Sequence, residues 1–545
     1  MSEQITGGEV IARTLRAHGV TAAFGVISIH NTPILDAFDR LGAIRFYEAR
    51  SESGATNMAD AYARVHGGLG VVVTSTGPGA GNACGGLTEA MAACTPLIHL
   101  TGNIDSADVD HDRGMNHEAL GQLDMLKAVS KAAFRVRSAQ ALVSTLCRAI
   151  EIALTVPRGP VSIEIPIDIQ AKLTKMPANV PVIEPPALAA TDVGALEALV
   201  NAAREAKRPM LWIGDGAREA RSEIARLMKL GFGVVTSIHG RAIVDESDPM
   251  SLATLNNLDP TQAFFETCDL MIVVGSRLRG TETRIHKLKL PHPLIQVDVD
   301  IAAMNRNYEA DLFVRGSSQA VLKALADRLE GGREASPQFG QDLLKAKHDG
   351  MELMRKQCGP YALISDALRA VMPRDAVFVR DVTISANTWA HRVLQLPADA
   401  GTVHALGGGI GQGLQHAIGA KAAAGAREVY ALCGDGGLAL NMGELATAVQ
   451  EKTDMTIVLM NDGGYGVIRN ICDAAYGRQF FSELLAPGWQ DLCRTLGIRS
   501  WHVKDVNSFR EALDASSSTA GVRLIEVDMK AVGPFPIAFA GPRAK

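Results

Sequence analysis

The fold of this chain follows from two glycine-rich stretches, Cys433-Gly434-Asp435-Gly436-Gly437 and Met460-Asn461-Asp462-Gly463-Gly464-Tyr465-Gly466. Each stretch follows an apolar run of strand type, at 429–432 and 456–460. A helix-like segment at 443–449 separates them. This order predicts a parallel sheet in which both glycine loops emerge at the carboxyl edge, where such sheets bind ligands.

The two loops carry the groups that a metal-bound diphosphate requires. Asp435 and Asp462 supply oxygen ligands, and Mg²⁺ is usually held by one or two protein groups together with phosphates. The glycines allow backbone N–H groups at a helix start to approach an anion closely. The spacing therefore predicts a Mg²⁺ and diphosphate site.

A second Gly-Asp-Gly triplet serves as an internal comparison. Gly214-Asp215-Gly216 also follows an apolar run, but no Asn-Asp pair lies near position 242, at the corresponding distance. We therefore interpret Asp215 as part of an ordinary strand-to-helix turn. The pairing of two loops, rather than the triplet alone, distinguishes the site at Asp435.

The paired loops resemble the binding motif of thiamine diphosphate (ThDP) enzymes, a family that includes acetolactate synthase, benzoylformate decarboxylase and pyruvate decarboxylase. The resemblance implies that Asp435, Asp462 and the carbonyl of Gly464 are metal ligands. The family more often has Asn where this chain has Asp462, and aspartate is an equally hard ligand. The other expected cofactor-binding residues of these loops are Gly434, Gly436, Gly437, Tyr465 and Gly466.

Composition and charge exclude several classes of protein. The chain of 545 residues has 47% apolar and 21% charged residues and a net charge of −5, without a basic block, so neither nucleic acid nor a membrane surface is an expected partner. No apolar run has the length of a membrane span. The eight cysteines form no Cys-x-x-Cys pair and the N-terminus lacks the pattern of a signal peptide. These features predict a cytoplasmic protein with reduced thiols.

Proline- and glycine-rich stretches at 176–190 and 330–340 resemble linkers. They predict three domains, at 1–178, 190–332 and 350–545. Short β-branched runs alternate with Ala-rich helical patterns in each, which is typical of α/β domains with doubly wound parallel sheets. The family resemblance implies that the first domain binds the cofactor's pyrimidine, that the last binds its diphosphate, and that the middle domain is largely structural. Expected strands include 70–74, 160–165, 270–274 and 294–298.

The acid–base partner of the cofactor is expected in the first domain. ThDP becomes reactive when a carboxylate forms a hydrogen bond with its pyrimidine ring nitrogen. The segment 50–64, with Ser51-Glu52 before Ala59-Asp60-Ala61-Tyr62-Ala63-Arg64, resembles the family's His-Glu followed by Ala-Asp-Gly-Tyr-Ala-Arg. The resemblance places the catalytic glutamate at Glu52. Taken alone, Glu52 would be a solvated carboxylate in the first turn of a helix, with Ser51 as its cap.

Two further glycine-rich segments complete the expected pocket. Residues 406–414 resemble the family's Gly-x-Met-Gly-x-Gly segment, which implies that Ile410 wedges between the cofactor rings and that the Gly408 carbonyl accepts from its amino group. The alternative is a glycine-rich helix start, since the strand and helix order of a dinucleotide fingerprint is not met. Residues 75–82 resemble a turn beside the pyrimidine, with Ser75, Gly79 and Asn82 as the expected contacts, although each glycine would also suit a structural turn.

Two histidines are candidates for proton transfer. His30 lies in a segment that resembles the family's first-domain loop beside the thiazolium, and His117 lies near the position where acetolactate synthases have Gln and some decarboxylases have His. The resemblance implies that both could transfer protons, since imidazole titrates near neutrality. Each would equally suit a structural role. Pyruvate decarboxylases have a glutamate near the position of Ile468, so the apolar residue here indicates a drier pocket, closer to that of benzoylformate decarboxylase or benzaldehyde lyase.

The resemblance implies a ThDP- and Mg²⁺-dependent enzyme that decarboxylates a 2-oxo acid. The resulting enamine is then protonated or, as in acetolactate synthase, captured by a second carbonyl. The alternatives are a benzaldehyde lyase-type enzyme and a non-catalytic protein that binds a diphosphate or nucleotide. Residues 251–257 lack the Gly-Met-x-Gly run of flavin-binding members, so no FAD is expected. A homodimer or homotetramer with sites between subunits is implied.

Overall fold

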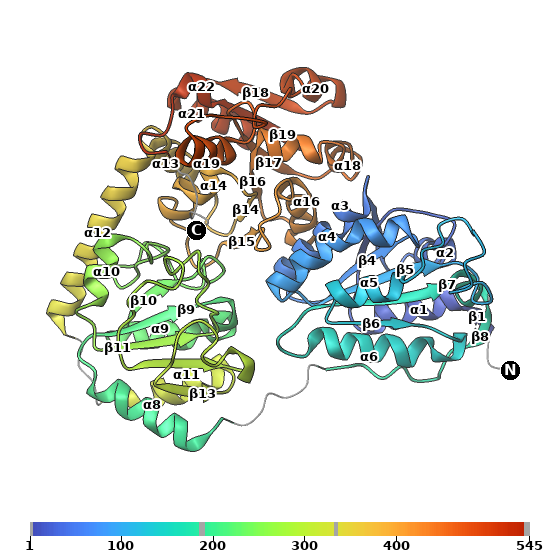
Figure 1. Cartoon of the computed structure of the whole chain (residues 1–545), viewed down its shortest axis with the longest axis horizontal. Coiled ribbons are helices and arrows are strands. Elements are labelled where there is room, and N and C mark those ends of the chain that lie inside the picture. Colours follow the sequence, from blue (N-terminus) through green and yellow to red (C-terminus); the bar gives the residue numbers. More distant parts are fainter. Residues whose placement is uncertain (1–3, 185–190, 332–335, 539–545) are drawn as a thin grey trace.

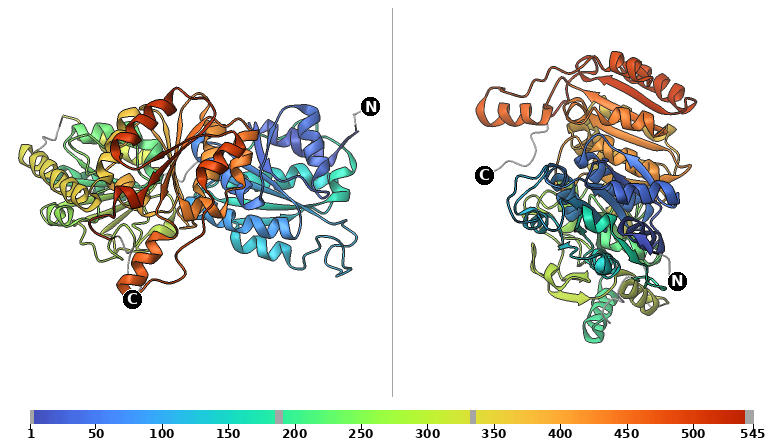
Figure 2. Two further views of the ribbon diagram at one scale, coloured as in Figure 1. Left: turned by 90° about the horizontal axis from the view of Figure 1, so that it is seen from above. Right: turned by 90° about the vertical axis from the view of Figure 1, so that its right-hand side faces the viewer.

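The computed structural model describes residues 4–184, 191–331 and 336–538. It contains three parallel α/β sheets, as the sequence predicts. Figure 1 shows the first domain in blue and cyan, the middle domain mainly in green, and the last domain in orange and red. Seen from above in Figure 2, the last domain lies between the other two.

The first sheet has the order β3-β2-β4-β5-β7-β6 and all its pairings are parallel. A two-stranded antiparallel pair, β1 with β8, lies outside it and was not expected. The strands of this domain are β1 (Gln4–Thr6), β2 (Ala22–Gly25), β3 (Arg45–Glu48), β4 (Gly70–Thr74), β5 (Leu97–Asn103), β6 (Ala132–Arg135), β7 (Pro160–Pro166) and β8 (Leu173–Lys175). Its helices are α1 (Gly7–Ala17), α2 (Thr32–Leu41), α3 (Glu52–His66), α4 (Pro78–Ala93), α5 (Gln122–Val129), α6 (Leu142–Leu154) and α7 (Ile167–Ala171).

The middle sheet has five parallel strands in the order β10-β9-β11-β12-β13. They are β9 (Pro209–Ile213), β10 (Gly233–Thr236), β11 (Leu270–Val274), β12 (Leu294–Asp298) and β13 (Leu312–Arg315). The helices are α8 (Val193–Glu205), α9 (Arg221–Lys229), α10 (Asp259–Phe265) and α11 (Ser318–Leu329), followed by α12 (Pro337–Cys358). Helix α12 begins inside the stretch 330–340 that was expected to be a linker, because Ser336 caps it and Pro337 suits its first turn.

The last sheet has the order β15-β14-β16-β17-β19-β18. When only the strands of each sheet are numbered along the chain, this order is the same as in the first sheet. The strands are β14 (Val377–Arg380), β15 (Gly401–His404), β16 (Val429–Gly434), β17 (Met455–Asn461), β18 (Arg499–Val503) and β19 (Val522–Asp528). The helices are α13 (Tyr361–Val371), α14 (Ile384–Asn387), α15 (Trp389–Arg392), α16 (Gly413–Ala424), α17 (Asp435–Leu440), α18 (Glu444–Gln450), α19 (Gly466–Tyr476), α20 (Trp489–Leu496), α21 (Val506–Ser517) and α22 (Met529–Val532).

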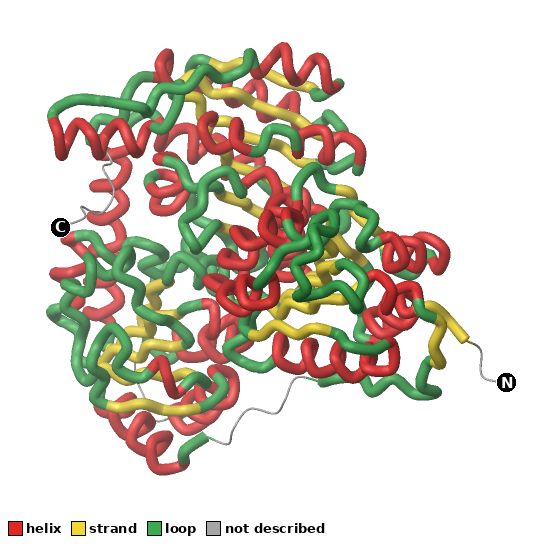
Figure 3. The backbone as a smooth tube through the Cα atoms, turned by 45° about the vertical axis from the view of Figure 1, so that its right-hand side comes forward, coloured by secondary structure: helices red, strands yellow, loops and turns green. Residues whose placement is uncertain are grey.

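Helices cover both faces of each sheet, as Figure 3 shows. Successive residues of a strand point to opposite faces, and in β16 Ala431 joins one apolar core while Tyr430 and Leu432 join another. The first of these cores is shared by the first and last domains. Helices α3 and α16 pack together in it through residues such as Met58 and Ile418.

In the first and last sheets, several of the expected site residues follow the carboxyl ends of strands at the reversal of strand order. Ligands of open parallel sheets bind where the strand order reverses, at the carboxyl ends of the strands. The reversal lies between β2 and β4 in the first sheet and between β14 and β16 in the last. His30, Ser75 and Asp435 all follow one of these strands. Among the described residues, no helix is long and apolar enough to cross a membrane.

Candidate active site

The two glycine loops of the last domain meet at the carboxyl edge of its sheet. Strands β16 and β17 are paired in parallel, and Asp435 and Asp462 directly follow them. The backbone N–H of Asp462 donates to Oδ1 of Asp435 at 3.2 Å. The structure thus brings together the two carboxylates that the sequence places 27 positions apart.

The environment of Asp435 suits a carboxylate that binds a cation. Its side chain is 2% exposed, and its Oδ2 atom has no hydrogen-bond partner in the described structure. Burial and the negative charge of Asp462 raise the pKa of Asp435 to about 6. A cation between the two carboxylates would offset both effects, because its positive charge stabilises the deprotonated form of each.

A third oxygen lies beside these carboxylates. Gly464 has a φ of +147°, which favours glycine. Its carbonyl oxygen is 2.8 Å from the point that a Cβ on Gly436 would occupy, so a side chain at position 436 would collide with it. Two carboxylates and a carbonyl are hard donors that fit Mg²⁺. No group of three or more His, Cys, Asp or Glu suited to a metal occurs among the described residues, so phosphate or water oxygens would have to complete the coordination.

The other expected residues of the two loops lie around this donor set. Gly434 ends β16, and the buried Gly436 and Gly437 lie in the first turn of α17. The N–H of Tyr465 donates to the carbonyl of Ser482 at 2.8 Å, and α19 begins at Gly466. A short segment at 482–483 therefore packs against the second loop, which the sequence did not indicate.

Asp462 also forms an ion pair that the sequence did not reveal. The Nη2 atom of Arg469, on α19, lies 2.9 Å from Oδ2 of Asp462 and donates to its backbone carbonyl at 2.9 Å. Both side chains are largely buried, at 16% and 20% exposure. The guanidinium balances the negative charge that distinguishes aspartate from asparagine at this position.

The loop that carries Gly408 and Ile410 is anchored by a residue that the sequence analysis missed. The buried carboxylate of Asp381 accepts from the N–H of Gly411 at 3.0 and 3.1 Å. Burial raises the pKa of Asp381 despite these and other backbone donors. Asp381 directly follows β14, where the strand order reverses. Its position just after this strand is the sequence signal that could have identified it as a site residue. The side chain of Ile410 is 40% exposed.

In the first domain, Glu52 lies at the start of α3. The Oγ atom of Ser51 caps this helix by accepting from the N–H of Gly54, as expected. The Nδ2 atom of Asn82 donates to Oε2 of Glu52 at 3.1 Å. A Cβ on Gly79 would lie 2.9 Å from Oε1 of Glu52, so the absence of a side chain there leaves room for the carboxylate. Three of the residues expected to contact the pyrimidine are therefore neighbours.

Of the two candidate histidines, His117 contacts Ser75, and His30 lies beside His117. The Oγ atom of Ser75 is 3.2 Å from Nδ1 of His117, and the rings of His30 and His117 are 5.2 Å apart. Burial and the neighbouring His117 lower the pKa of His30, so that its imidazole is neutral at pH 7. Its buried Nδ1 atom has no hydrogen-bond partner in the described structure.

Two buried side chains that the sequence analysis did not single out hold these groups in place. Gln122 accepts from the Oγ atom of Thr76 at 2.9 Å and from the N–H of Gly77 at 2.6 Å, which fixes the turn after β4. Glu444, on α18, accepts from the N–H of Arg50 at 3.1 Å through each of its carboxylate oxygens. It also accepts from the Oγ atom of Ser51 at 3.2 Å. Glu444 thereby connects the start of α3 with the last domain.

The first-domain group and the last-domain group remain separate within one chain. Across the ranges that the structure describes, no hydrogen bond or ion pair connects Glu52, His30 or His117 with Asp435 or Asp462. Large apolar side chains are exposed near both groups. They are Ile27, Ile29, Met115 and Leu120 in the first domain, and Ile410, Leu440, Met442 and Ile468 in the last.

Comparison with known proteins relates all three domains to one family. Residues 5–127 match the thiamine pyrophosphate enzyme N-terminal TPP binding domain, 196–325 match the central domain, and 384–527 match the C-terminal TPP binding domain. Thiamine pyrophosphate (TPP) is another name for ThDP.

Similar proteins align over nearly their whole length. A probable 2-ketoarginine decarboxylase of Pseudomonas aeruginosa is 29% identical over 535 residues, which cover 96% of this chain and 94% of that protein. The large subunit of acetolactate synthase isozyme 2 of Escherichia coli is 27% identical over 544 residues, 96% of each chain. An acetolactate synthase of Arthrospira platensis is 26% identical over 553 residues, 96% of this chain and 94% of that protein.

Proposed function

This chain belongs to the thiamine pyrophosphate enzyme family, and we propose that it uses ThDP and Mg²⁺ to decarboxylate a 2-oxo acid. The observation that carries this proposal is the meeting of Asp435 and Asp462 at the edge of the last sheet, where a buried oxygen of Asp435 has no hydrogen-bond partner among the described residues. The similarity to both a decarboxylase and acetolactate synthases supports a reaction in which a 2-oxo acid loses CO₂.

Residues of the last domain would hold the metal and the diphosphate. Asp435, Asp462 and the Gly464 carbonyl would bind Mg²⁺, as the unpartnered oxygen and the raised pKa of Asp435 support. The N–H groups of Gly436 and Gly437 would approach the diphosphate at the start of α17. We propose no role for FAD, since residues 251–257 lack the Gly-Met-x-Gly run of flavin-binding members.

Residues of the first domain and the loop at 406–412 would hold the cofactor's rings. When bound, ThDP supplies a thiazolium carbon that adds to the carbonyl of the substrate and accepts the electron pair left by CO₂. Glu52 would hydrogen-bond the pyrimidine nitrogen and share its proton. The Gly408 carbonyl would accept from the pyrimidine's amino group, and Ile410 would fill the space between the rings.

His30 and His117 would move protons to and from the substrate. Their rings are 5.2 Å apart, and Ser75 contacts His117. A neutral His30, with an unpartnered Nδ1 atom, suits a relay that accepts a proton before it donates one. This arrangement favours protonation of the decarboxylated substrate, and hence a decarboxylase, over capture by a second carbonyl.

Product analysis tests the choice between these reactions. The purified protein would be incubated with ThDP, Mg²⁺ and a panel of 2-oxo acids, including pyruvate and 2-ketoarginine, with and without aldehyde acceptors. We expect mass spectrometry to find the aldehyde that remains after the 2-oxo acid has lost CO₂. A 2-hydroxyketone or acetolactate as the main product would instead identify a carboligase. Absence of any product, with ThDP bound, would favour the non-catalytic alternative.

The active protein is proposed to be a cytoplasmic homodimer or homotetramer. The separation of the two groups of site residues within one chain, and the exposed apolar side chains near both, support a site completed by a second copy. All eight cysteines are free, which suits a reducing compartment. No nucleic acid or membrane is proposed as a partner.

The ion pair between Asp462 and Arg469 gives a prediction for metal binding. Asp462→Asn leaves the charge of Arg469 unbalanced beside the cation, so we expect the affinity for Mg²⁺ to fall about tenfold, as coupling energies between contacting residues allow. Asp462→Asn combined with Arg469→Met should restore most of the affinity. Isothermal titration with Mg²⁺ in the presence of ThDP measures both. Additive losses in the double variant would contradict the proposed balance of charge.

A further inference from the structure

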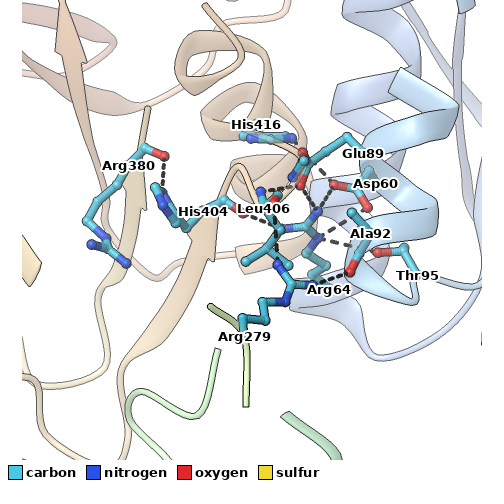
Figure 4. A network of polar contacts seen from close by, with 11 residues as sticks. Asp60, Arg64, Glu89, Ala92, Thr95, Arg279, Arg380, His404, Leu406 and His416 are labelled. Atoms are coloured by element: carbon cyan, nitrogen blue, oxygen red, sulfur yellow. Dashed lines mark hydrogen bonds and ion pairs between the residues drawn. The ribbon is translucent and has the colours of Figure 1, made fainter. Parts of the chain in front are cut away.

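A buried polar cluster joins all three domains beside the loop at 406–412. Figure 4 shows its two arginines, Arg64 from α3 and Arg279 from the middle domain, together with the carboxylate of Glu89 from α4. The cluster lies at the end of β15, where the last domain's chain enters the loop that carries Gly408 and Ile410. None of these side chains has a part in the proposed function above.

Glu89 binds the loop through two consecutive backbone groups. Its Oε1 atom accepts from the N–H of Leu406 at 2.7 Å, and its Oε2 atom accepts from the N–H of Gly407 at 2.7 Å. The side chain is 1% exposed. Hydrogen bonds to a buried charged acceptor are among the stronger ones in proteins. A carboxylate of the first domain therefore fixes the backbone of a loop that lies 317 residues further along the chain.

Arg64 holds this carboxylate in place. Its Nη2 atom lies 2.9 Å from Oε1 of Glu89 and 2.6 Å from Oδ2 of the fully buried Asp60. Its Nη1 atom donates to the carbonyl of His404, the last residue of β15, at 2.8 Å. Arg64 is thus bonded to the strand before the loop and to the residue that binds the loop.

Arg279 binds the same loop from the middle domain. Its Nη1 atom donates to the carbonyl of Leu406 at 3.3 Å, and its Nη2 atom donates to the carbonyl of Ala92, on α4, at 2.8 Å. At its other end, the loop is held by the bonds from Gly411 to Asp381 described above. Residues 408–410, which would contact the cofactor's rings, therefore lie between two backbone segments that are bound by the buried carboxylates of Glu89 and Asp381.

We propose that Glu89 is a positioning residue that sets the conformation of residues 406–410 for ThDP, with Arg64 and Arg279 as its supports. The inference rests on the proposed function, because it assigns the cofactor's rings to this loop. Glu89 would act through the loop backbone without touching the cofactor. Its role would be to keep the Gly408 carbonyl and Ile410 in place before ThDP binds, so that binding does not have to order them.

Glu89→Gln tests this role with little change in shape. The amide has one acceptor oxygen, so its NH₂ group must face Gly407 or the Arg64 side of the cluster and one backbone N–H loses its partner. We expect the amides of 406 and 407 to exchange hydrogen faster in the cofactor-free protein. We also expect ThDP, with saturating Mg²⁺, to bind about 10- to 100-fold more weakly in a fluorescence titration.

Glu9→Gln is the matched control. Glu9 is also buried and also lies between two arginines, Arg13 at 2.5 Å and Arg40 at 2.6 Å. It lies on α1, and in the part of the chain that the structure describes its hydrogen bonds and ion pairs are with Thr6, Arg13 and Arg40 and not with the loop. The Glu9→Gln variant should lower the stability of the protein without altering hydrogen exchange at 406 and 407 or the affinity for ThDP. Where Glu89→Gln does not fold, Arg279→Met removes a second bond to Leu406 and should give smaller changes in the same directions.

The two readouts separate this inference from the proposed function. Unchanged exchange at 406 and 407, or faster exchange with unchanged ThDP binding, would each overturn the positioning role of Glu89. If the unmodified protein failed to bind ThDP, the proposed function would fall instead. The exchange data would then still report whether Glu89 holds the loop.

Discussion

Glu52→Gln is expected to lower kcat by about 10²- to 10⁴-fold, the usual contribution of a positioned acid–base group. Glutamine keeps the size of the side chain and the bond from Asn82, which lies 3.1 Å from Oε2. It cannot share a proton with the pyrimidine nitrogen. Proton exchange at the reactive carbon of the bound cofactor should therefore slow by a similar factor, while ThDP should still bind. Both quantities can be measured, by steady-state kinetics and by quenched-flow NMR.

A second glutamate in the first turn of a helix provides the control for this variant. Glu223 lies in the first turn of α9 in the middle domain, far along the chain from the proposed site, and its change to Gln should leave turnover and exchange as they are. Equal exchange rates in Glu52→Gln and the unmodified protein would mean that Glu52 is only the solvated helix-start carboxylate that its sequence position alone suggests.

The sequence predicted the fold closely where strands are buried on both faces. The runs at 70–74, 270–274 and 294–298 are β4, β11 and β12 to the residue, because continuous apolar runs between turn residues are typical of central parallel strands. The same reasoning did not detect β1 and β8, which have three residues each and form an antiparallel pair. So short a pair has too few residues for a periodic pattern to appear.

The sequence predicted those residues of the proposed site that belong to local motifs. It did not predict the residues that hold them in place through contacts between distant parts of the chain. Glu52, Asn82 and Gly79 lie together as their motifs suggested. The residues that hold them do not share a motif with them. Glu444 reaches Arg50 across 394 positions, and Glu89 reaches Leu406 across 317. The packing of the first domain against the last, which includes that of α3 against α16, brings such pairs together, and no local pattern encodes that packing. The domain boundaries and the roles of the site residues stay predictions.

Asp435→Asn is expected to have the largest effect on cofactor binding. Loss of an outer-shell partner alone costs metal sites about 10- to 100-fold in affinity, and Asp435 would be a direct ligand, so Mg²⁺ should bind more than about 100-fold more weakly. ThDP affinity should fall with it, because the metal would hold the diphosphate. Titration calorimetry measures both. Asp215→Asn is the control, since Asp215 has the same flanking glycines but is exposed and paired with Arg218 at 3.0 Å.

The raised pKa of Asp435 adds a pH dependence to this prediction. Without metal, burial and Asp462 raise the pKa to about 6. Mg²⁺ binds the deprotonated carboxylate, so below that pH a proton must leave as the metal binds. The affinity of the unmodified protein should therefore fall up to about tenfold per pH unit below 6 and be nearly constant above 7. In Asp435→Asn this dependence should weaken. A dependence that persisted unchanged would assign the titration to another group.

The Glu52→Gln and Asp435→Asn variants together test whether the site is shared between subunits. If each site takes Glu52 from one chain and Asp435 from its partner, a dimer with one subunit of each kind has one site with both defects and one with neither. Equal mixtures that exchange subunits freely would form such dimers half of the time and should regain about a quarter of the original activity. If both residues of a site came from one chain, every site in the mixture would carry one defect, and no activity would return.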